Sequence, residues 1–342
     1  MTTTTEDLHL NLQSHAVPAP RRGTRQPWRI ARIAFGALGL LAVIAASGTA
    51  YELIAGTGDT AVYPPAGRLV DIGGYKLHLD CRGEGSPTVV MDAGLGGSSL
   101  DWALVQPELA RATQVCTYDR AGMGWSDPGP QPRSPAHLAQ ELHALLQNGG
   151  VPGPYVLVGH SLAGKNIRMF AAAHPHDVAG MVLVDARSEA VEANSDMKAF
   201  AAALDAQAGL YAVARRLGIA RLFGAMLIDV PQLPPSLATE MALAQTNASA
   251  IAETTLEGLS RTANDQALAS ASLGSLPLIV IAAGESMRSI PGWPAAQKAM
   301  TALSTKGQLL IAENSSHAVQ LVEPSLVIDA ALSLVAEARK GD

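Results

Sequence analysis

From about residue 57 onward, short hydrophobic runs rich in Val, Ile and Leu alternate with longer segments of helical periodicity. The later runs are continuous rather than alternating, which is typical of parallel strands covered by helices on both faces. This rhythm predicts one doubly wound α/β domain. We predict strands at 68–72, 75–80, 88–92, 113–118, 155–159, 180–185, 277–283 and 307–312, and helices at 101–111, 135–149, 162–174, 291–305 and 322–339.

Residues 188–272 interrupt the alternation. They separate two predicted strands by a stretch rich in Ala and Leu that is too long for a plain connection. Their apolar content argues against a disordered loop. We predict a helical cap inserted over the carboxyl edge of the sheet, which leaves 65–187 and 273–340 as the two parts of the α/β core.

One long apolar run lies near the N-terminus. Residues 33–51 contain 19 residues without a charge, with Trp28 and Tyr51 at the flanks and five arginines before the run. As a helix this run would span about 30 Å, the thickness of a bilayer core. Because arginines mark the cytoplasmic side, we predict a membrane anchor with a disordered, basic cytoplasmic tail (1–32) and an extracytoplasmic domain.

Two other interpretations of this run stay open. Small residues at 46–48 and 48–50 fit cleavage by signal peptidase, after which the domain would be exported without an anchor. The segment that precedes the apolar run is long for a signal peptide. A helix buried in the globular domain is the third interpretation, although the sequence shows no folded partner for it.

Composition excludes several classes of protein. Hydrophobic residues make up 48% of the 342 residues and charged residues 16%, which provides ample core and excludes intrinsic disorder of the whole chain. The net charge of −6 argues against a nucleic-acid partner. Two cysteines are too few for a disulfide scaffold or a cysteine-based zinc site, and we predict no metal.

The sharpest chemical signal is the hexapeptide GHSLAG at residues 159–164. It follows an apolar strand and precedes a helix, so Ser161 is expected on a sharp turn with its hydroxyl exposed. The helix that follows directs its N-terminus at this position and favours negative charge there. The usual pattern is G-x-S-x-G, and here Ala163 takes the place of the second glycine. The alternative is a serine that only caps a helix.

A serine needs a base to remove its proton. His317 differs from the other histidines because it follows the last predicted strand in a short polar loop and precedes the final helix. That loop is expected at the same edge of the sheet as Ser161, so we predict His317 as the base.

Several acids are candidates for orienting the imidazole. Asp185 ends the predicted strand next to the one that carries the serine, and Glu285 follows the seventh predicted strand. We favour Asp185 and keep Glu285 as the alternative, with Asp59 and other acids less favoured.

Backbone N–H groups are needed to stabilise a developing oxyanion. The residue after the serine, Leu162, is expected to supply one. The glycine-rich segment at 92–97 (DAGLGG) is expected to supply the other, from Leu95. A phosphate cradle is the rival interpretation of this segment, but it lacks the spaced glycines and the lysine of such motifs.

Over about residues 65–340 the chain resembles a serine hydrolase of the α/β-hydrolase fold superfamily, of the esterase and lipase kind. The resemblance implies a mostly parallel, eight-stranded sheet and the chain order serine, acid, histidine. Two features depart from the family pattern. Ala93 replaces a histidine in the first loop, and Met287 occupies the usual acid position after strand seven, which is why we favour Asp185. The matching segments are AGLGGSSLDW (93–102), YDRAGMGWSDPG (118–129), GHSLAG (159–164), AGMVLVD (179–185) and SSHAVQLVEP (315–324).

The resemblance also bears on the two cysteines. In this fold the second and fourth strands are neighbours, and Cys81 and Cys116 fall on them, so a cross-strand disulfide is expected in an extracytoplasmic domain. Two buried free thiols are the alternative.

These observations predict an enzyme that cleaves carboxylic esters of small or apolar substrates through an acyl-serine, without a cofactor. The same groups serve an amidase, a thioesterase, a lactonase or an acyltransferase. A non-catalytic, membrane-tethered binding module is the alternative outside enzymes, because fold does not establish function. The sequence does not indicate an oligomeric state.

Overall fold

The computed structural model describes residues 26–56, 58–189, 210, 213–214, 216–219, 221–223, 232–246 and 248–341. Most of the predicted N-terminal tail (1–32) and much of the first half of the predicted cap therefore lie outside the described residues. The chain divides into two compact units, Met1–Ala46 and Ser47–Asp342.

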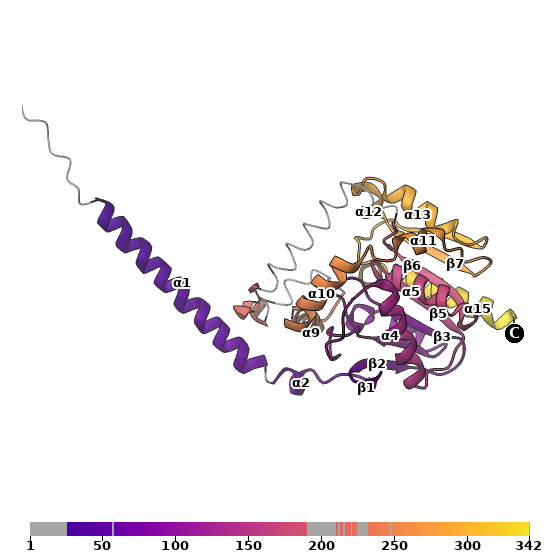
Figure 1. Ribbon diagram of the computed structural model, residues 1–342, viewed down its shortest axis with the longest axis horizontal. Helices are drawn as coiled ribbons and strands as arrows, with labels where there is room; N and C mark the ends of the chain where they lie inside the picture. Colours follow the sequence, from indigo (N-terminus) through magenta and orange to yellow (C-terminus); the bar gives the residue numbers. More distant parts are fainter. Residues whose placement is uncertain are drawn as a thin grey trace, which may run out of the picture. The chain divides into compact units, whose positions relative to one another are not determined.

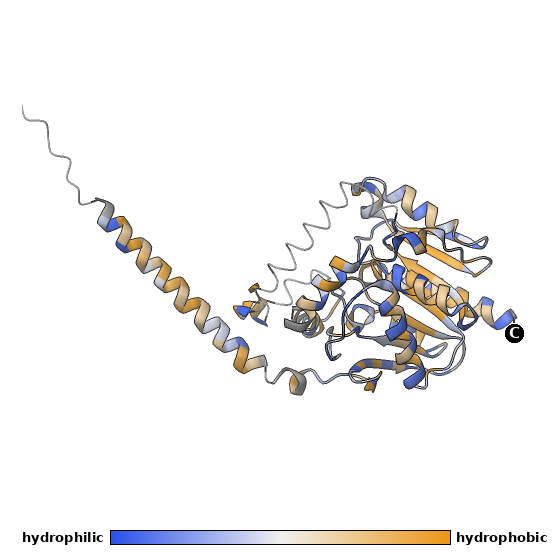
Figure 2. Cartoon of the chain, viewed as in Figure 1, coloured by the Kyte–Doolittle hydropathy of each residue, from blue (hydrophilic) through white to orange (hydrophobic). Residues whose placement is uncertain are grey.

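The N-terminal apolar run forms helix α1 (Gln26–Gly56). The helix extends beyond the predicted range of 33–51 at both ends, and Pro27 near its start is tolerated because the first turn has no intrahelical N–H bond to lose. Within α1, Trp28–Ala55 is long and apolar enough to cross a membrane. Its most apolar 18-residue window has a mean hydropathy of 2.0, and no part of that window is buried. Figure 2 shows hydrophobic residues along most of its length.

The second unit is built on one eight-stranded sheet (Figure 1). Its strand order is β1-β2-β4-β3-β5-β6-β7-β8, with β1–β2 and β2–β4 antiparallel and the remaining pairs parallel. This confirms the predicted fold class. The strands are β1 (Arg68–Asp71), β2 (Lys76–Arg82), β3 (Thr88–Asp92), β4 (Val115–Tyr118), β5 (Tyr155–His160), β6 (Val178–Val184), β7 (Leu278–Ala283) and β8 (Gly307–Ala312).

The connecting segments form helices at the predicted places. The described ones in the second unit are α2 (Asp59–Val62), η1 (Ser99–Trp102), α3 (Gln106–Leu109), α4 (Pro135–Asn148), α5 (Ala163–Ala173), η2 (Pro175–Asp177), α9 (Pro235–Thr246), α10 (Ala248–Ser260), α11 (Asp265–Ser270), α12 (Gly284–Ser289), α13 (Trp293–Thr301), α14 (Val319–Val322) and α15 (Pro324–Gly341). Ser134 caps the N-terminus of helix α4, and its hydroxyl accepts from the His137 N–H.

The sheet has a hydrophobic core on each face. Strand side chains alternate between the faces, so Val90 and Leu157 belong to one core while Met91 and Val158 belong to the other. The first core also includes α4, α5 and α13, and the second includes α3, α14 and α15. Because both faces are covered, the central strands read as continuous apolar runs in the sequence.

Cys81 on β2 and Cys116 on β4 are register partners and form a disulfide. The bond joins the antiparallel edge of the sheet to its parallel part across 35 positions of sequence. A closed loop of that size stabilises a fold by about 3–4 kcal/mol in the chain-entropy account.

The segment between β6 and β7 is helical where it is described: α9, α10 and α11 follow one another there. Buried residues such as Met241, Ala250 and Glu257 show that these helices pack onto the rest of the unit. The limits of the cap at 188–272 stay a prediction.

Candidate active site

Ser161 lies in the two-residue connection between β5 and α5. Its backbone has φ +52°, a value that non-glycine residues seldom adopt and that the surroundings must hold in place. The Ser161 N–H donates to Val184 O at 3.0 Å and its carbonyl accepts from the Arg187 N–H at 3.0 Å. The end of β6 therefore fixes the turn.

Two glycines near Ser161 are required by close contacts. A Cβ on Gly159 would lie 2.8 Å from Ile167 Cδ1, and one on Gly164 would lie 2.6 Å from Ala186 Cβ. The second tight contact thus falls three residues after the serine. This explains why Ala163 is accommodated where the usual pattern has glycine.

Asp185 lies just beyond β6 and is fully buried, with φ +39°. Its Oδ1 accepts from the Ala283 N–H at 3.0 Å and from Trp293 Nε1 at 2.7 Å. Its Oδ2 accepts from Ser286 Oγ at 2.6 Å and from His317 Nδ1 at 2.7 Å. The carboxylate therefore has four donors, and one of them is the predicted base.

These donors decide the charge of Asp185. Burial alone would raise the pKa of the carboxyl, but hydrogen bonds from His317, Ser286 and the Ala283 N–H outweigh burial and hold the pKa below its ordinary value. Asp185 is thus ionised at neutral pH and accepts from Nδ1–H of His317, whose side chain is 46% exposed.

The alternative acids lie elsewhere. Glu285 is exposed in the first turn of α12, and its N–H donates to Ser315 O at 3.1 Å. Met287, which occupies the family's usual acid position, is part of a small apolar cluster with Trp293. Asp59 belongs to α2, and its side chain lies outside the described residues.

The two predicted oxyanion donors lie beside the serine turn. A Cβ on Gly94 would be only 3.3 Å from Ser161 Cβ, so the loop that carries Leu95 closely approaches the turn. Leu162 is the N-cap of α5. In the part of the chain that the structure describes, neither the Leu95 nor the Leu162 N–H donates a hydrogen bond. Both donors are therefore available to a ligand.

A family model described as the alpha/beta hydrolase fold matches residues 87–324. The chain belongs to the α/β hydrolase fold family. An uncharacterized protein of Schizosaccharomyces pombe is 32% identical over 218 residues, which are 64% of this chain and 40% of that protein. The chain thus spans less than half the length of that relative.

Solved hydrolases share the fold of this chain. An esterase from Exiguobacterium antarcticum matches with a TM-score of 0.62 and 17% identity, over 79% of this chain and 99% of the esterase. A laboratory-evolved variant of potato epoxide hydrolase matches with a TM-score of 0.61 and 18% identity, over 79% and 98% of the two chains. Identities this low establish the fold alone.

His160, next to the serine, has a structural role in this protein that the sequence did not reveal. Its Nε2–H donates to the carbonyl of His317 at 2.9 Å, which ties the serine turn to the histidine loop. Burial, together with the nearby His317 ring, lowers the pKa of His160 to about 3. His160 is therefore neutral at physiological pH.

Arg120 is a second residue that sequence reasoning missed. Its side chain is 2% exposed and donates to Asp92 Oδ1 at 2.7 Å and to the carbonyls of Ala93 and Gly94 at 2.6 and 2.7 Å. It also pairs with Glu257 of α10, at 2.8 and 2.9 Å. The arginine thereby joins the Leu95 loop to α10, in the segment between β6 and β7. Arg120 lies in the segment YDRAGMGWSDPG (118–129), which the sequence identified only as similar to the family and without a role for the arginine.

We predict that His160 makes the stability of the protein depend on pH. Its pKa is about 3 in the folded protein against an ordinary value of 6.5 once unfolded, so its contribution to stability is complete above pH 6.5 and is lost as pH falls. The loss is up to about 1.4 kcal/mol per pH unit. Chemical unfolding at pH 7 and pH 5 should show a smaller decrease for His160→Gln, which keeps a donor for the same carbonyl. Equal decreases would contradict the prediction.

Proposed function

We propose that this α/β hydrolase cleaves carboxylic esters of small or apolar substrates through an acyl-serine intermediate, with Ser161, His317 and Asp185 as its catalytic groups. The observation that carries the proposal is the 2.7 Å hydrogen bond from His317 Nδ1 to the buried Asp185 carboxylate. The histidine loop is also tied to the serine turn through His160.

The tautomer of His317 gives the first step. With Nδ1–H donated to Asp185, the lone pair of Nε2 is free to accept a proton. His317 takes the proton of the Ser161 hydroxyl as its oxygen attacks the ester carbonyl, and Asp185 stabilises the resulting imidazolium. His317 then gives that proton to the leaving alcohol as the ester C–O bond breaks, which leaves the acyl group on Ser161.

Water completes the cycle. His317 removes a proton from a water molecule, the oxygen of the water adds to the acyl carbonyl, and the proton returns to Ser161 as the acid leaves. These steps use side chains and backbone groups of this chain, and the proposal includes no cofactor.

Oxyanion stabilisation is assigned to the N–H groups of Leu95 and Leu162. Their lack of acceptors among the described residues and the N-terminus of α5 at this point support the assignment. Arg120 is proposed as a positioning residue, because it holds the carbonyls of Ala93 and Gly94 just before Leu95.

The nucleophile favours ester chemistry over two other reactions of such folds. Epoxide hydrolysis and dehalogenation require a carboxylate nucleophile, and this chain has a serine at the strand–helix turn. Amide, thioester and acyl-transfer chemistry use the same groups and stay alternatives. The substrate pocket is assigned to the cap at 188–272, whose aliphatic composition suits apolar groups.

We also propose that α1 anchors the enzyme in a membrane. The length, apolar composition and exposure of Trp28–Ala55 support an anchor. The arginines before it favour a cytoplasmic N-terminus and an extracytoplasmic hydrolase domain, where a disulfide such as Cys81–Cys116 persists. Cleavage of the segment, with export of the domain, is the alternative.

Labelling of the full chain, purified in detergent, with a fluorophosphonate tests the proposal. We expect one adduct by intact mass on the wild type and on Ser316→Ala, and none on Ser161→Ala, because only an activated serine reacts. Nitrophenyl esters of increasing chain length and a nitroanilide then separate esterase from amidase activity. A folded wild-type protein without an adduct would overturn the hydrolase mechanism in favour of a binding module.

The identity of the acid gives a second prediction. Asp185→Asn should lower kcat by up to about 10⁴-fold, because an amide favours the wrong tautomer of the histidine. Glu285→Gln should leave kcat unchanged, because its side chain is exposed. Steady-state hydrolysis of one ester by both variants compares the two acids directly. The reverse ranking would assign the role to Glu285.

Arg120 gives a third prediction, and Glu257→Gln is its mildest test. Weakening the Arg120–Glu257 pair should let the Leu95 loop move away from the serine turn. Complete loss of one oxyanion donor lowers kcat by about 10²–10³-fold, so a partial displacement of the loop should lower kcat by less than that and leave KM little changed. Arg111→Lys, in an exposed ion pair with Glu108, is the matched control. An unchanged kcat in Glu257→Gln would refute the positioning role.

A further inference from the structure

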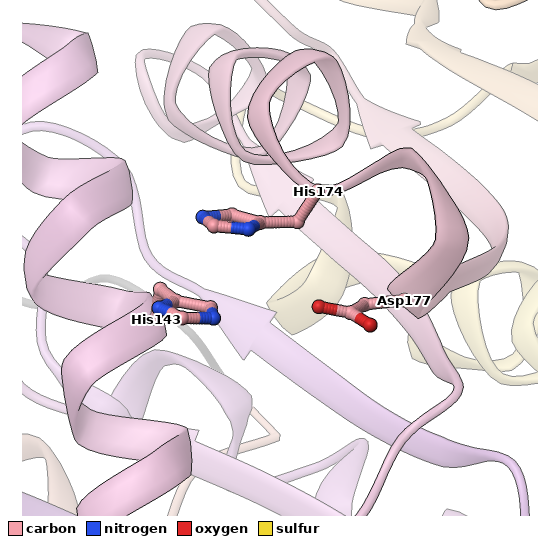
Figure 3. Close-up of side chains that lie close together, drawn as sticks. All are labelled: His143, His174 and Asp177. Carbon is pink, nitrogen blue, oxygen red and sulfur yellow. The ribbon is translucent and has the colours of Figure 1, made fainter.

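A cluster of metal-ligating side chains lies outside the proposed active site. His143 is on α4, His174 directly follows α5, and Asp177 ends η2 (Figure 3). Their potential ligand atoms all lie within 4.8 Å of one another. We propose that these three residues bind one divalent ion of the zinc class, with water as a further ligand.

The local backbone holds two of the ligands together. His174 and Asp177 are three residues apart around a 3₁₀ turn, whose three-residue period places them on the same side. Pro175 begins this turn, and the Asp177 N–H donates to His174 O at 3.1 Å. The two side chains therefore lie on the same side of the turn, and Figure 3 shows the Asp177 carboxylate beside the stacked rings of His143 and His174.

Helix packing brings the third ligand. Buried leucines of α4 and Phe170 of α5 share one core, and this contact places the His143 ring near the end of α5. The rings of His143 and His174 are stacked, with centroids 3.8 Å apart and an angle of 4° between their planes. All three ligand residues are partly exposed, so an ion can reach them.

The donor set suits a zinc-class ion. Two imidazole nitrogens and one carboxylate oxygen are ligands that Zn²⁺ takes, with water at an open position. The C-terminal end of α5 adds partial negative charge beside His174, which favours a cation there.

The distances also define what binding must change. Ligand atoms on a tetrahedral Zn²⁺ are about 3.4 Å apart at metal–ligand distances near 2.1 Å. Lone pairs lie in the plane of each ring, so two parallel rings do not direct them at one ion. Binding must therefore turn the rings about χ2 and draw the three side chains closer.

The position of the cluster assigns it a structural role. It lies at the C-terminal end of α5, whereas Ser161 precedes the N-terminal end, and the 11 residues of α5 span about 16 Å. The ion would join α4 to α5 on one face of the sheet. It would stabilise the fold without taking part in ester cleavage.

Zinc titration of the full chain, purified in detergent without a histidine tag and treated with a chelator, tests the proposal. Isothermal calorimetry should show one Zn²⁺ bound per chain. Thermal unfolding should show a Tm that rises with Zn²⁺ concentration. Asp177→Asn and His143→Ala should raise Kd by more than about tenfold, since even an outer-shell partner contributes that much. Co²⁺ should give the visible absorption of a low-coordinate site in the wild type and lose it in His174→Ala.

His176 provides the matched control, because it is exposed in the same turn and is not part of the cluster. His176→Ala, and a variant with both His9 and His15 replaced by Ala, should bind Zn²⁺ like the wild type. Asp177→Asn is nearly isosteric, and circular dichroism verifies its fold. The proposal is overturned if Asp177→Asn and His143→Ala bind like the wild type, or if His176→Ala weakens binding equally.

Discussion

The buried carboxylate of Asp185 is the group on which the candidate site depends. A fully buried charge is tolerated only when hydrogen bonds satisfy it. Its four donors come from Ala283 at the end of β7, Ser286 in α12, Trp293 in α13 and His317 after β8. One carboxylate thus holds the end of β7, α12 and α13 in place and also fixes the tautomer of the predicted base.

Two residues with positive φ, Ser161 and Asp185, follow the carboxyl ends of the neighbouring parallel strands β5 and β6. They are coupled through the backbone, because the Ser161 N–H donates to Val184 O and the Asp185 N–H donates to Ile281 O. The parallel sheet supplies the hydrogen bonds that hold both turns in sparsely populated conformations. This explains how serine and acid are placed before any substrate binds.

A second buried charge extends this arrangement beyond the sheet. Arg120 interacts with Asp92 at the end of β3, with the loop before Leu95 and with Glu257 of α10. Burial by itself would lower the pKa of Arg120, but the two carboxylates raise it well above its ordinary value. The proposed oxyanion loop and the helices after β6 are therefore linked by groups that must stay paired.

The sequence by itself determined the eight strands, the main helices of the core, the strand–turn–helix around Ser161 and the place of His317 in a loop. These are local properties, because a strand covered on both faces or a helix with one buried side leaves its period in consecutive residues. It left the acid open, since Asp185 and Glu285 both follow strands. Tertiary structure decided which carboxylate meets His317 and which partners Arg120 has. Contacts between residues that are distant in sequence, such as Asp185 with His317 and Arg120 with Glu257, depend on strand order and helix packing, which no local pattern encodes.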